Sequence, residues 1–375
     1  MSNTKIGIDA RLINETGVGV YIRNLLNNLG RLPTSDIEFY VYVKSHNDFN
    51  SQISNFKSHI ANFQWHSFSE QIGFLHQLYR DDLDLMHFTY FSYPLLYRRP
   101  FIITIHDLTP LLFATGKAST HNKIIYSIKR LAAQALIKNA FHASEIIITP
   151  TTSVKNLITE SYGKDGAHKI SVTHEGLNEE LLSIKENRKL SKRFDKPFFM
   201  YVGNFYPHKN VENLIRAFAK TKIKAQLILI GPNDYFAARS LQLINQLKQT
   251  RRIVLYSNPK LEDLVFFYKH AQALLHPSLA EGFGLPLLEA SYFKCPIIAS
   301  DIAIFHEVLE NNYLAFNPHS IEDIAHKIEY FFTHKNNSTS LYLPQKTIEN
   351  KFSFQKMAQE TLKIYREEAH HTRGV

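Results

Sequence analysis

The sequence has almost no cysteine and no long apolar run, and each absence excludes a class of protein. Cys295 is the single cysteine among 375 residues, so neither a disulfide framework nor a cysteine-rich zinc site can be built. No stretch reaches the roughly 18 consecutive apolar residues of a membrane-spanning helix. Because residues 1–4 run directly into a strand-like segment, we expect a cytoplasmic protein that is not exported.

The composition is not that of a disordered protein, since 44% of the residues are hydrophobic and 13% are aromatic. The chain is too long for one ordinary core, and a usual size of roughly 150 residues per domain predicts two domains. Despite 19 histidines, no cluster has the spacing of metal ligands, and we expect neither a metal nor another cofactor. An acidic pair at Asp82 and Asp84 is better interpreted as the capped entrance of a strand.

Acidic residues are outnumbered by basic ones, and the net charge of +9 predicts an anionic partner. The basic residues are spread along the chain without a nucleic-acid-binding motif, so we expect no nucleic acid partner. Within residues 117–138, Lys123, Lys129, Arg130 and Lys138 lie beside an apolar stripe at helical spacing. This pattern predicts peripheral contact with the anionic inner face of the cytoplasmic membrane. A core helix with a solvated face is an equally good interpretation.

Strand-like and helix-like segments alternate along the whole chain, which predicts an α/β fold of mainly parallel sheets covered by helices. Two sets of strands are expected. The first comprises Lys5–Asp9, Ile37–Val43, Leu83–Phe88, Phe101–His106, Glu145–Thr149 and Lys169–His174, and the second comprises Phe198–Gly203, Gln226–Gly231, Arg252–Tyr256, Ala273–His276, Pro296–Ser300 and Tyr313–Phe316.

A charged stretch without apolar periodicity separates the two sets and predicts a linker over residues 183–197. We therefore expect an N-terminal domain over 1–182 and a C-terminal domain over 198–351. A last helix over 352–375 is expected to cross back to the N-terminal domain, with its tail frayed from Glu367 onward.

The most informative stretch is Glu281–Glu289, which combines two glycines, a helix start and two carboxylates. Gly282 and Gly284 allow the backbone to approach a ligand closely, and Pro286 fits the first position of a helix. The free amides at the start of that helix favour an anion such as a diphosphate. Because the carboxylates at the two ends of the stretch accept hydrogen bonds from hydroxyls, the pattern indicates a nucleotide-sugar site. The alternative is an ordinary strand-to-helix turn.

A second candidate segment, residues 201–210, is expected to form a strand, a turn and the start of a helix over 211–220. Asn210 is predicted to cap that helix. Lys209 then lies at a helix N-terminus, which suits a cation that serves a phosphate, whereas an exposed surface lysine is the alternative.

His106 and Asp107 close a strand of the first half before a proline. A neutral imidazole there could bond a sugar hydroxyl or an acceptor. A structural histidine bonded to backbone is the more common outcome for an isolated histidine, and Asp107 could simply cap the turn. If the two domains face each other, the carboxyl ends of both sets of strands surround one cleft, and His106, Lys209 and Glu281 all follow such ends.

Gly17, Val18 and Gly19 open an apparent helix over 20–29 and resemble a dinucleotide-binding loop only poorly, because Ile22 occupies the third glycine position. We prefer a flexible loop at the mouth of the cleft that touches the acceptor.

With these motifs the chain resembles the retaining GT-B glycosyltransferases of family four, especially bacterial mannosyltransferases of lipopolysaccharide O-antigen and surface polysaccharide synthesis. The resemblance implies two Rossmann-like domains facing each other across a cleft. It also implies metal-independent transfer of a hexose with retention of configuration onto a glycan or lipid-linked glycan. Mannose from GDP-mannose is the favoured donor, and a UDP-sugar is the alternative.

The resemblance also assigns roles to residues. Glu289 should hold the donor ribose, Glu281 the transferred sugar, and Lys209 the diphosphate. The catalytic candidates are Glu281, Lys209 and His106; the donor-binding candidates are Gly203, Asn204, His208, Lys209, Ser257, Asn258, Glu281, Gly282, Phe283, Gly284, Leu285 and Glu289; the acceptor-binding candidates are Gly17, Val18, Gly19, His106 and Asp107.

The sequence departs from the family pattern at one place. Relatives commonly carry an arginine at the position of Asn204 or of His208, and this chain has neither. Our hypothesis is that a protonated His208 supplies part of the missing charge. Two other functions stay open: a catalytically silent nucleotide-sugar-binding partner of a polysaccharide assembly complex, and a sugar-nucleotide epimerase on the same fold.

Overall fold

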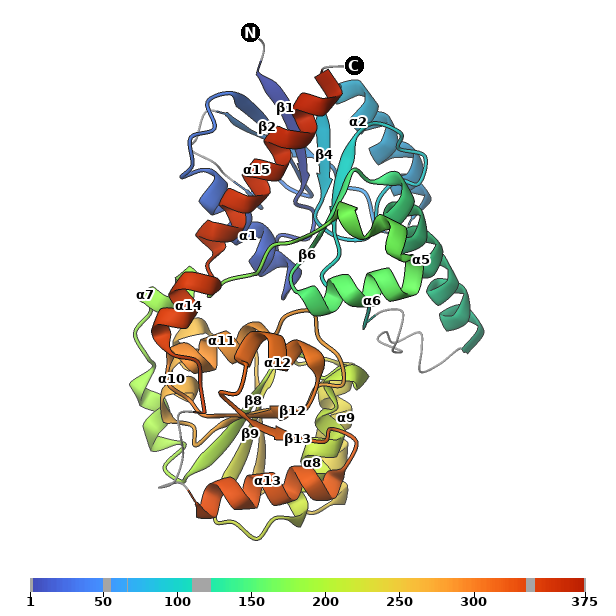
Figure 1. The fold of residues 1–375 in the computed structure, drawn as a ribbon. Helices are drawn as coiled ribbons and strands as arrows, with labels where there is room; N and C mark the ends of the chain where they lie inside the picture. Colours follow the sequence, from blue (N-terminus) through green and yellow to red (C-terminus); the bar gives the residue numbers. More distant parts are fainter. Residues whose placement is uncertain (1–2, 50–54, 66, 110–122, 335–340, 374–375) are drawn as a thin grey trace. The chain divides into compact units, whose positions relative to one another are not determined.

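The structure is a computed structural model of the chain, and it describes residues 3–49, 55–65, 67–109, 123–334 and 341–373. The chain divides into two compact units (Figure 1). The first unit comprises residues 1–111, 127–176 and 352–375, and the second comprises residues 112–126 and 177–351. Among the described residues, no helix is both long and apolar enough to cross a membrane.

The first unit is built on a seven-stranded sheet in which all neighbouring strands are parallel. Its strand order is β3-β2-β1-β4-β5-β6-β7. The strands are β1 (Thr4–Asp9), β2 (Ile37–Val43), β3 (Phe56–Ile60), β4 (Leu85–Phe88), β5 (Phe101–Thr104), β6 (Ile146–Thr149) and β7 (Ile170–Val172). The central strands are short, fully buried apolar runs such as Phe101–Thr104, as expected where helices cover both faces of a parallel sheet.

Helices of the first unit connect these strands. They are α1 (Val18–Leu29), the π-helix η1 (Glu70–Phe74), α2 (Leu75–Asp81), α5 (Lys123–Ala143, from residue 127 onward), α6 (Thr152–Tyr162), the short 3-10 helix η2 (Lys164–Lys169) and α15 (Phe354–Arg373).

Helix α15 belongs to the first unit, although the whole second unit precedes it in the sequence. It runs beside α1 (Figure 1). The Tyr365 hydroxyl lies 2.7 Å from Nδ1 of the buried His87 on β4, and Arg366 binds both carboxylate oxygens of Asp36. The helix continues to Arg373, six residues beyond Glu367, from which the tail was expected to fray.

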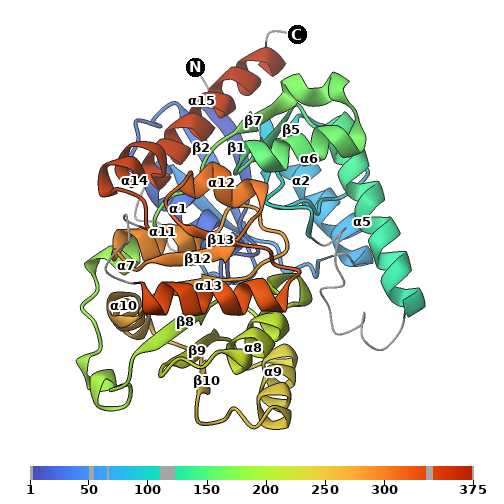
Figure 2. The same ribbon diagram turned by 60° about the horizontal axis from the view of Figure 1, so that its bottom comes forward.

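The second unit contains a six-stranded parallel sheet in the order β10-β9-β8-β11-β12-β13. Figure 2 shows β8, β9 and β10 side by side. The strands are β8 (Phe198–Val202), β9 (Gln226–Gly231), β10 (Ile253–Ser257), β11 (Leu274–His276), β12 (Ile297–Ser300) and β13 (Leu314–Phe316).

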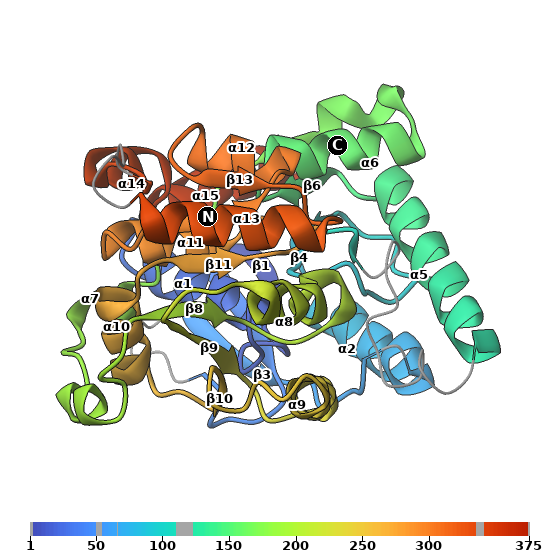
Figure 3. The ribbon, with the colours of Figure 1, turned by 90° about the horizontal axis from the view of Figure 1, so that it is seen from below.

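Ten helices surround this sheet in the described part of the second unit. They are α7 (Glu179–Ser183), η3 (Arg188–Lys192), η4 (Pro207–Lys209), α8 (Val211–Lys220), α9 (Tyr235–Gln246), α10 (Leu261–His270), α11 (Leu285–Tyr292), α12 (Ala303–Leu309), α13 (Ile321–Thr333) and α14 (Gln345–Lys351). Helix α13 packs beside α8 (Figure 3), and both contribute to the core over β8 and β9.

All twelve predicted strands are present, with ends that differ by at most two residues. Strand β3 was not predicted, because Lys57, Ser58 and His59 give it little apolar character at the sheet edge. The charged stretch that suggests a linker contains η3, and its apolar residues Leu190 and Phe194 are buried in the second unit.

Candidate active site

The turn after β8 is held against the end of β9. Gly203 has a φ of 144°, and a Cβ added at Gly231 would lie 2.2 Å from the carbonyl oxygen of Gly203. Only glycine at position 231 therefore permits this close approach. The chain then forms η4, which carries His208 and Lys209, and α8 begins at Val211.

Asn210 fastens this turn to two neighbouring loops. Its side-chain nitrogen donates to the carbonyl oxygens of Pro277 at 3.1 Å and Pro318 at 2.7 Å. Asn210 is the N-cap of α8, as predicted, with a left-handed φ of 58°, but its side chain forms no capping bond to the helix because it binds the two loops instead. The backbone N–H of Leu279 also donates to the carbonyl of His208 at 2.7 Å. The loops after β8 and β11 therefore form one assembly.

The predicted helix start in the glycine-rich stretch is present. Gly284 is the N-cap with a φ of 97°, a conformation that favours glycine. Helix α11 begins at Leu285, and Pro286 is its second residue rather than its first. Phe283 is buried beside it. The first turn of α11 thus presents backbone N–H groups near the carboxyl ends of the parallel strands.

Glu281 lies beyond the carboxyl end of β11, and one of its oxygens accepts three hydrogen bonds. Oε1 lies 2.6 Å from Nζ of Lys209, 2.7 Å from Oγ of Ser278 and 3.0 Å from Nε2 of His276. The Glu281 and Lys209 side chains are 9% and 15% exposed. Burial would raise the pKa of Glu281, but the Lys209 charge and the His276 hydrogen bond outweigh it and hold that pKa well below its usual range. Glu281 is therefore ionised at neutral pH.

His208 does not supply a second positive charge. Burial, followed by the neighbouring charge of Lys209, lowers the pKa of His208 to about 4. In the ligand-free protein the ring is therefore neutral at pH 7, which contradicts a His208 that is protonated before the donor binds. Lys209 is thus the cation that this turn offers at the site.

Glu289 occupies a different environment on α11. Its Oε2 accepts a hydrogen bond from the Tyr268 hydroxyl at 2.6 Å. Burial raises the pKa of Glu289, and the bond from Tyr268 only partly opposes that change. The two acids of the motif therefore differ: Glu281 is paired with a cation, and Glu289 is held by a neutral hydroxyl.

The remaining donor-binding candidates lie at the ends of β8 and β10. The Asn204 carbonyl accepts from the Tyr201 hydroxyl at 2.5 Å. Ser257 ends β10, and Asn258 follows with a left-handed φ of 52°. The Asn258 N–H donates to the Gly231 carbonyl at 2.9 Å, which fixes this turn beside β9.

In the first unit, both ring nitrogens of His106 are occupied. Nε2 bonds the Thr89 carbonyl at 3.0 Å, and Nδ1 lies 3.1 Å from Oε1 of Glu175. The Tyr21 ring packs edge-on against the imidazole, with centroids 4.7 Å apart. A sugar hydroxyl that bonds His106 would have to replace one of these contacts. The Asp107 carboxylate accepts from the Thr109 N–H at 2.8 Å, as the turn-capping interpretation predicts.

A buried polar chain continues from this histidine and was not predicted. The Tyr21 hydroxyl lies 3.2 Å from Oγ1 of Thr104, which lies 2.8 Å from Nε2 of His87, and Nδ1 of His87 contacts Tyr365. Burial, and then the charge of His106, lowers the pKa of His87 to about 3. These partners are distant in sequence, so no local pattern could have revealed the chain.

A buried ion cluster at the end of β1 was also not predicted. The Arg11 guanidinium bonds both oxygens of Asp9 and Oε1 of Glu70, and it stacks on the Phe74 ring 4.0 Å from the centroid. These bonds fasten η1 to the end of β1.

The three acceptor-binding candidates of the N-terminal loop are placed at the start of α1. Gly17 is the N-cap, and Val18 and Gly19 form the first turn. A Cβ at Gly19 would lie 2.6 Å from the carbonyl oxygen of Ile13. Helix α1 therefore begins at Val18, two residues before the predicted start, and the expectation of a loop is wrong for Val18 and Gly19. Because Gly19 has no Cβ, this first turn can pack closely against Ile13.

Two other predictions concern surfaces. The basic amphipathic segment 117–138 lies partly outside the described residues, and in its described part Leu131 and Lys138 are exposed on α5. In the described ranges, no three His, Cys, Asp or Glu side chains gather as a metal-ligand set.

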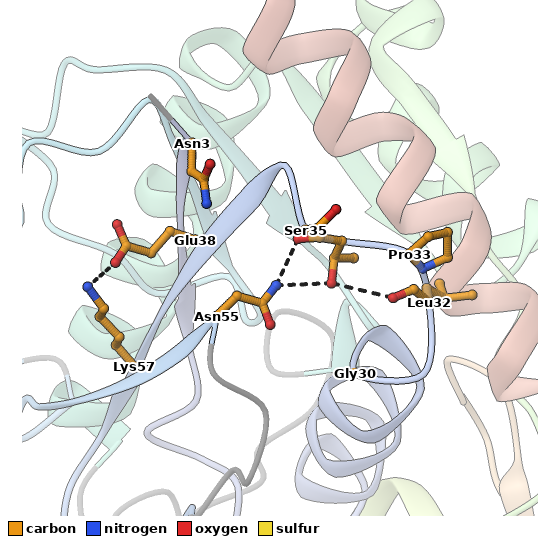
Figure 4. A pocket seen from close by; sticks show the side chains of 9 residues that line it. Asn3, Gly30, Leu32, Pro33, Ser35, Glu38, Asn55 and Lys57 are labelled. Carbon is orange, nitrogen blue, oxygen red and sulfur yellow. Dashed lines mark hydrogen bonds and ion pairs between the residues drawn. The ribbon is translucent and has the colours of Figure 1, made fainter. Parts of the chain in front are cut away.

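A pocket of about 610 Å³ lies at the amino ends of β1, β2 and β3, the opposite sheet edge from His106 (Figure 4). Asn55 bonds Thr34 inside it, and Lys57 pairs with Glu38. Asn55 and Lys57 are thus engaged within the pocket wall, and the pocket contains none of the predicted site residues.

Sequence models of two glycosyltransferase families match adjoining parts of the chain. Glycosyltransferase Family 4 matches residues 16–181, and Glycosyl transferases group 1 matches residues 182–351. This chain belongs to the GT-B glycosyltransferases. The group 1 match contains Lys209, Glu281 and Glu289, and the Family 4 match contains His106.

Individual relatives of this glycosyltransferase agree with that assignment. The chain is 29% identical over 230 residues to the O-antigen chain mannosyltransferase RfbU of Salmonella typhimurium, an alignment that covers 61% of this chain and 60% of the relative. The alignment thus leaves about two fifths of RfbU unmatched.

Solved structures share the fold. A sucrose-phosphate synthase from Thermosynechococcus elongatus superposes with a TM-score of 0.77 at 16% identity, over 97% of this chain and 99% of that one. HepE from Anabaena in complex with UDP-glucose superposes with a TM-score of 0.75 at 15% identity, over 97% and 100%. At these identities the likeness establishes the two Rossmann-like units.

Proposed function

We propose that this glycosyltransferase transfers mannose from GDP-mannose, with retention of configuration and without a metal, onto a glycan or lipid-linked glycan of cell-surface polysaccharide. The similarity to the mannosyltransferase RfbU supports mannose and a surface-polysaccharide acceptor. The fold shared with HepE, whose structure contains UDP-glucose, supports a nucleotide-sugar donor.

The observation that carries the proposal is the Lys209–Glu281 pair beside the first turn of α11. It combines a cation, an ionised carboxylate and the free N–H groups of a helix at the carboxyl ends of the strands. A sugar linked to a diphosphate requires these groups: donors for the phosphates and an acceptor for sugar hydroxyls. An ammonium has three N–H donors, so Lys209 can keep one bond to Glu281 and direct the others to a phosphate.

In the proposed reaction, the bond between the sugar C1 and the diphosphate oxygen breaks, and its electrons go to the leaving diphosphate. The acceptor hydroxyl oxygen attacks C1 from the same face and loses its proton to a phosphate oxygen. Lys209 and the α11 amides stabilise the negative charge that develops, a form of catalysis that costs little reorganisation because these groups are already oriented. Glu281 orients the sugar, and Glu289 binds the ribose hydroxyls.

The test is to incubate the purified protein with GDP-mannose, UDP-glucose or an ADP-sugar in the presence of glycan acceptors, and to follow nucleoside diphosphate release and product linkage. We expect release from GDP-mannose only when an acceptor is present, an α-linked product, and unchanged rates after chelation. Glu281→Gln and Lys209→Met should each remove at least about 99% of the rate, because each deletes a charged group at the reacting centre.

The alternatives give different results in the same assay. A silent partner would bind GDP-mannose and release no GDP with any acceptor. An epimerase would convert the donor sugar with no acceptor present. Either result would overturn the proposal.

We propose in addition that the first unit contacts an anionic membrane, which would bring it to a lipid-linked acceptor. Exposed apolar side chains support this idea: Phe68, Ile72 and Leu96 are 87%, 69% and 64% exposed. Gln71 joins their two segments through bonds to Tyr93 and Leu95. Arg80 and Arg98, which lie near these residues in the sequence, are also exposed, and the net charge is +9, a combination suited to anionic lipid.

Sedimentation with vesicles tests the membrane contact. The protein should bind phosphatidylcholine vesicles only when phosphatidylglycerol is added, and the double change Phe68→Ser with Ile72→Ser should abolish binding. Leu241→Ser is the control, since Leu241 is an exposed leucine of the second unit. Equal binding by both variants would refute this surface.

A further inference from the structure

His276, the last residue of β11, is held rigidly beside the candidate catalytic carboxylate. It is 2% exposed. Its ring lies nearly parallel to that of Tyr201 on β8, with centroids 6.2 Å apart and planes 20° apart, and it packs at 5.4 Å against Phe305 on α12. Contacts on two sides therefore fix the ring plane, and the strand fixes its backbone.

Hydrogen-bond donors and acceptors define how this ring is protonated. Nε2 lies 3.0 Å from Oε1 of Glu281, and because a carboxylate only accepts, Nε2 carries the hydrogen. Nδ1 is buried, and the described residues offer it no partner. A hydrogen on Nδ1 would thus be a buried donor without an acceptor, which is unfavourable. The geometry therefore assigns a hydrogen to Nε2, which donates to Glu281.

The three bonds to Glu281 are unevenly distributed. Lys209, Ser278 and His276 all donate to Oε1. Within the described parts of the chain Oε2 has no recorded partner, and it is not among the fully buried atoms that lack one. One oxygen is therefore anchored to the protein, while the other retains its lone pairs for a ligand.

The three donors also differ in kind. Lys209 carries its charge at the end of a long side chain, whereas the Ser278 and His276 side chains are short. If Lys209 were the only partner, its movement toward a phosphate would release a buried carboxylate. His276 at the end of β11 and Ser278 in the loop that follows hold that carboxylate whether or not the cation moves.

We propose that His276 and Ser278 are positioning residues that lock Oε1 of Glu281, so that Oε2 faces the transferred sugar while Lys209 turns to the diphosphate. The inference rests on the proposed function, because it assigns the sugar to Glu281 and the diphosphate to Lys209. It adds two residues to the site and states which carboxylate oxygen meets the substrate.

The electrostatics agree with this arrangement. After burial and the Lys209 charge, the hydrogen bond from His276 is the next largest influence on the Glu281 pKa, and it lowers that pKa. The other titratable groups near this carboxylate are His208, beside Lys209, and the buried Tyr201 on β8, whose pKa burial and the Glu281 charge raise. Neither donates to Glu281 among the recorded bonds.

The test compares His276→Phe, which keeps a ring but removes the donor, with His276→Gln, whose amide restores an N–H near Nε2. Ser278→Ala removes only a hydroxyl from a loop and serves if His276→Phe folds poorly. Three quantities are measured: the Glu281 titration by carboxyl NMR without substrate, GDP binding, and kcat and KM for GDP-mannose across pH.

We expect His276→Phe to raise the Glu281 pKa, to lower kcat about tenfold or more and to change GDP affinity less than about threefold, because a positioning role acts on the sugar rather than the nucleotide. The acidic limb of the pH profile of kcat/KM should move to higher pH. His276→Gln should recover most of the loss, and Ser278→Ala should show a smaller change in the same direction.

The inference is overturned if His276→Phe leaves the Glu281 titration and kcat unchanged, or if GDP binding falls as much as kcat, which would show a merely structural role. A wild-type protein that transfers no sugar from any donor would instead refute the proposed function. The NMR titration would still decide whether His276 and Ser278 hold the carboxylate.

Discussion

Replacing Lys209 by methionine should destabilise the second unit through the carboxylate that it leaves behind. Nζ of Lys209 lies 2.6 Å from Oε1 of Glu281, and both side chains are largely buried. At an effective dielectric constant of about 20, this separation corresponds to a gross attraction of about 6 kcal/mol, part of which desolvation offsets. Removing one partner of a buried pair costs about 3–5 kcal/mol. We expect about 3 kcal/mol, because Ser278 and His276 continue to donate to Glu281.

The assay is thermal unfolding followed by circular dichroism. For a domain of this size, about 3 kcal/mol corresponds to a midpoint lowered by about 6–12 °C at pH 7.5. Lys220→Met is the matched control, because the Lys220–Glu322 pair is exposed and should contribute no more than about 1 kcal/mol. Adding Glu281→Gln to Lys209→Met should restore part of the stability, since it removes the uncompensated charge.

The difference in unfolding free energy between the wild type and Lys209→Met should depend on pH in a predictable direction. In the wild type the folded-state pKa of Glu281 is lowered, so its stabilisation is present above the unfolded pKa and is lost as pH falls. In Lys209→Met burial should raise that pKa, so the penalty is present at high pH and is relieved as pH falls. The difference between the two proteins should therefore narrow from pH 7.5 to pH 5. A variant as stable as Lys220→Met at pH 7.5, or a double variant no more stable than Lys209→Met, would refute the reasoning.

Two further predictions concern stability. Gly231→Ala should lower the unfolding midpoint of the second unit by several degrees, because its Cβ would lie 2.2 Å from the Gly203 carbonyl and overpacking costs about 1–3 kcal/mol; an unchanged midpoint would contradict this. The pKa of His87 is lowered to about 3 by burial, so its stabilising contribution is present above the unfolded pKa of about 6.5 and is lost as pH falls through this range. His87→Gln should weaken the acid sensitivity of the first unit in urea titrations between pH 6.5 and pH 4, and an identical slope would argue against the assignment.

Periodicity sufficed for the sheets because their central strands are buried apolar runs between helices. Ile146–Thr149 and Phe198–Val202 carry this signal within a few residues. Edge strand β3 lacks it, since one face of Phe56–Ile60 meets solvent and carries polar side chains. Local chemistry also identified the start of α11, where Gly284 adopts a left-handed conformation.

Partners brought together by folding could not be predicted. Glu281 was recognised by its motif, but nothing in the spacing indicated that His276 and Ser278 share one of its oxygens. The Glu175 partner of His106 lies 69 positions away. The lowered pKa of His208 in the ligand-free protein was not predicted, because it arises from burial by the packed loops after β8 and β11.

The return of α15 to the first unit has a consequence for biosynthesis. Every strand of the first sheet is synthesised before residues 177–351 of the second unit, yet α15, which packs on α1 and supplies Tyr365, is synthesised after them. The apolar surface that α15 covers in the folded protein therefore stays exposed while the second unit is translated. Such exposed surface promotes aggregation and chaperone binding. A stop codon before α15 should consequently destabilise the first unit, although its sheet is synthesised before the second unit.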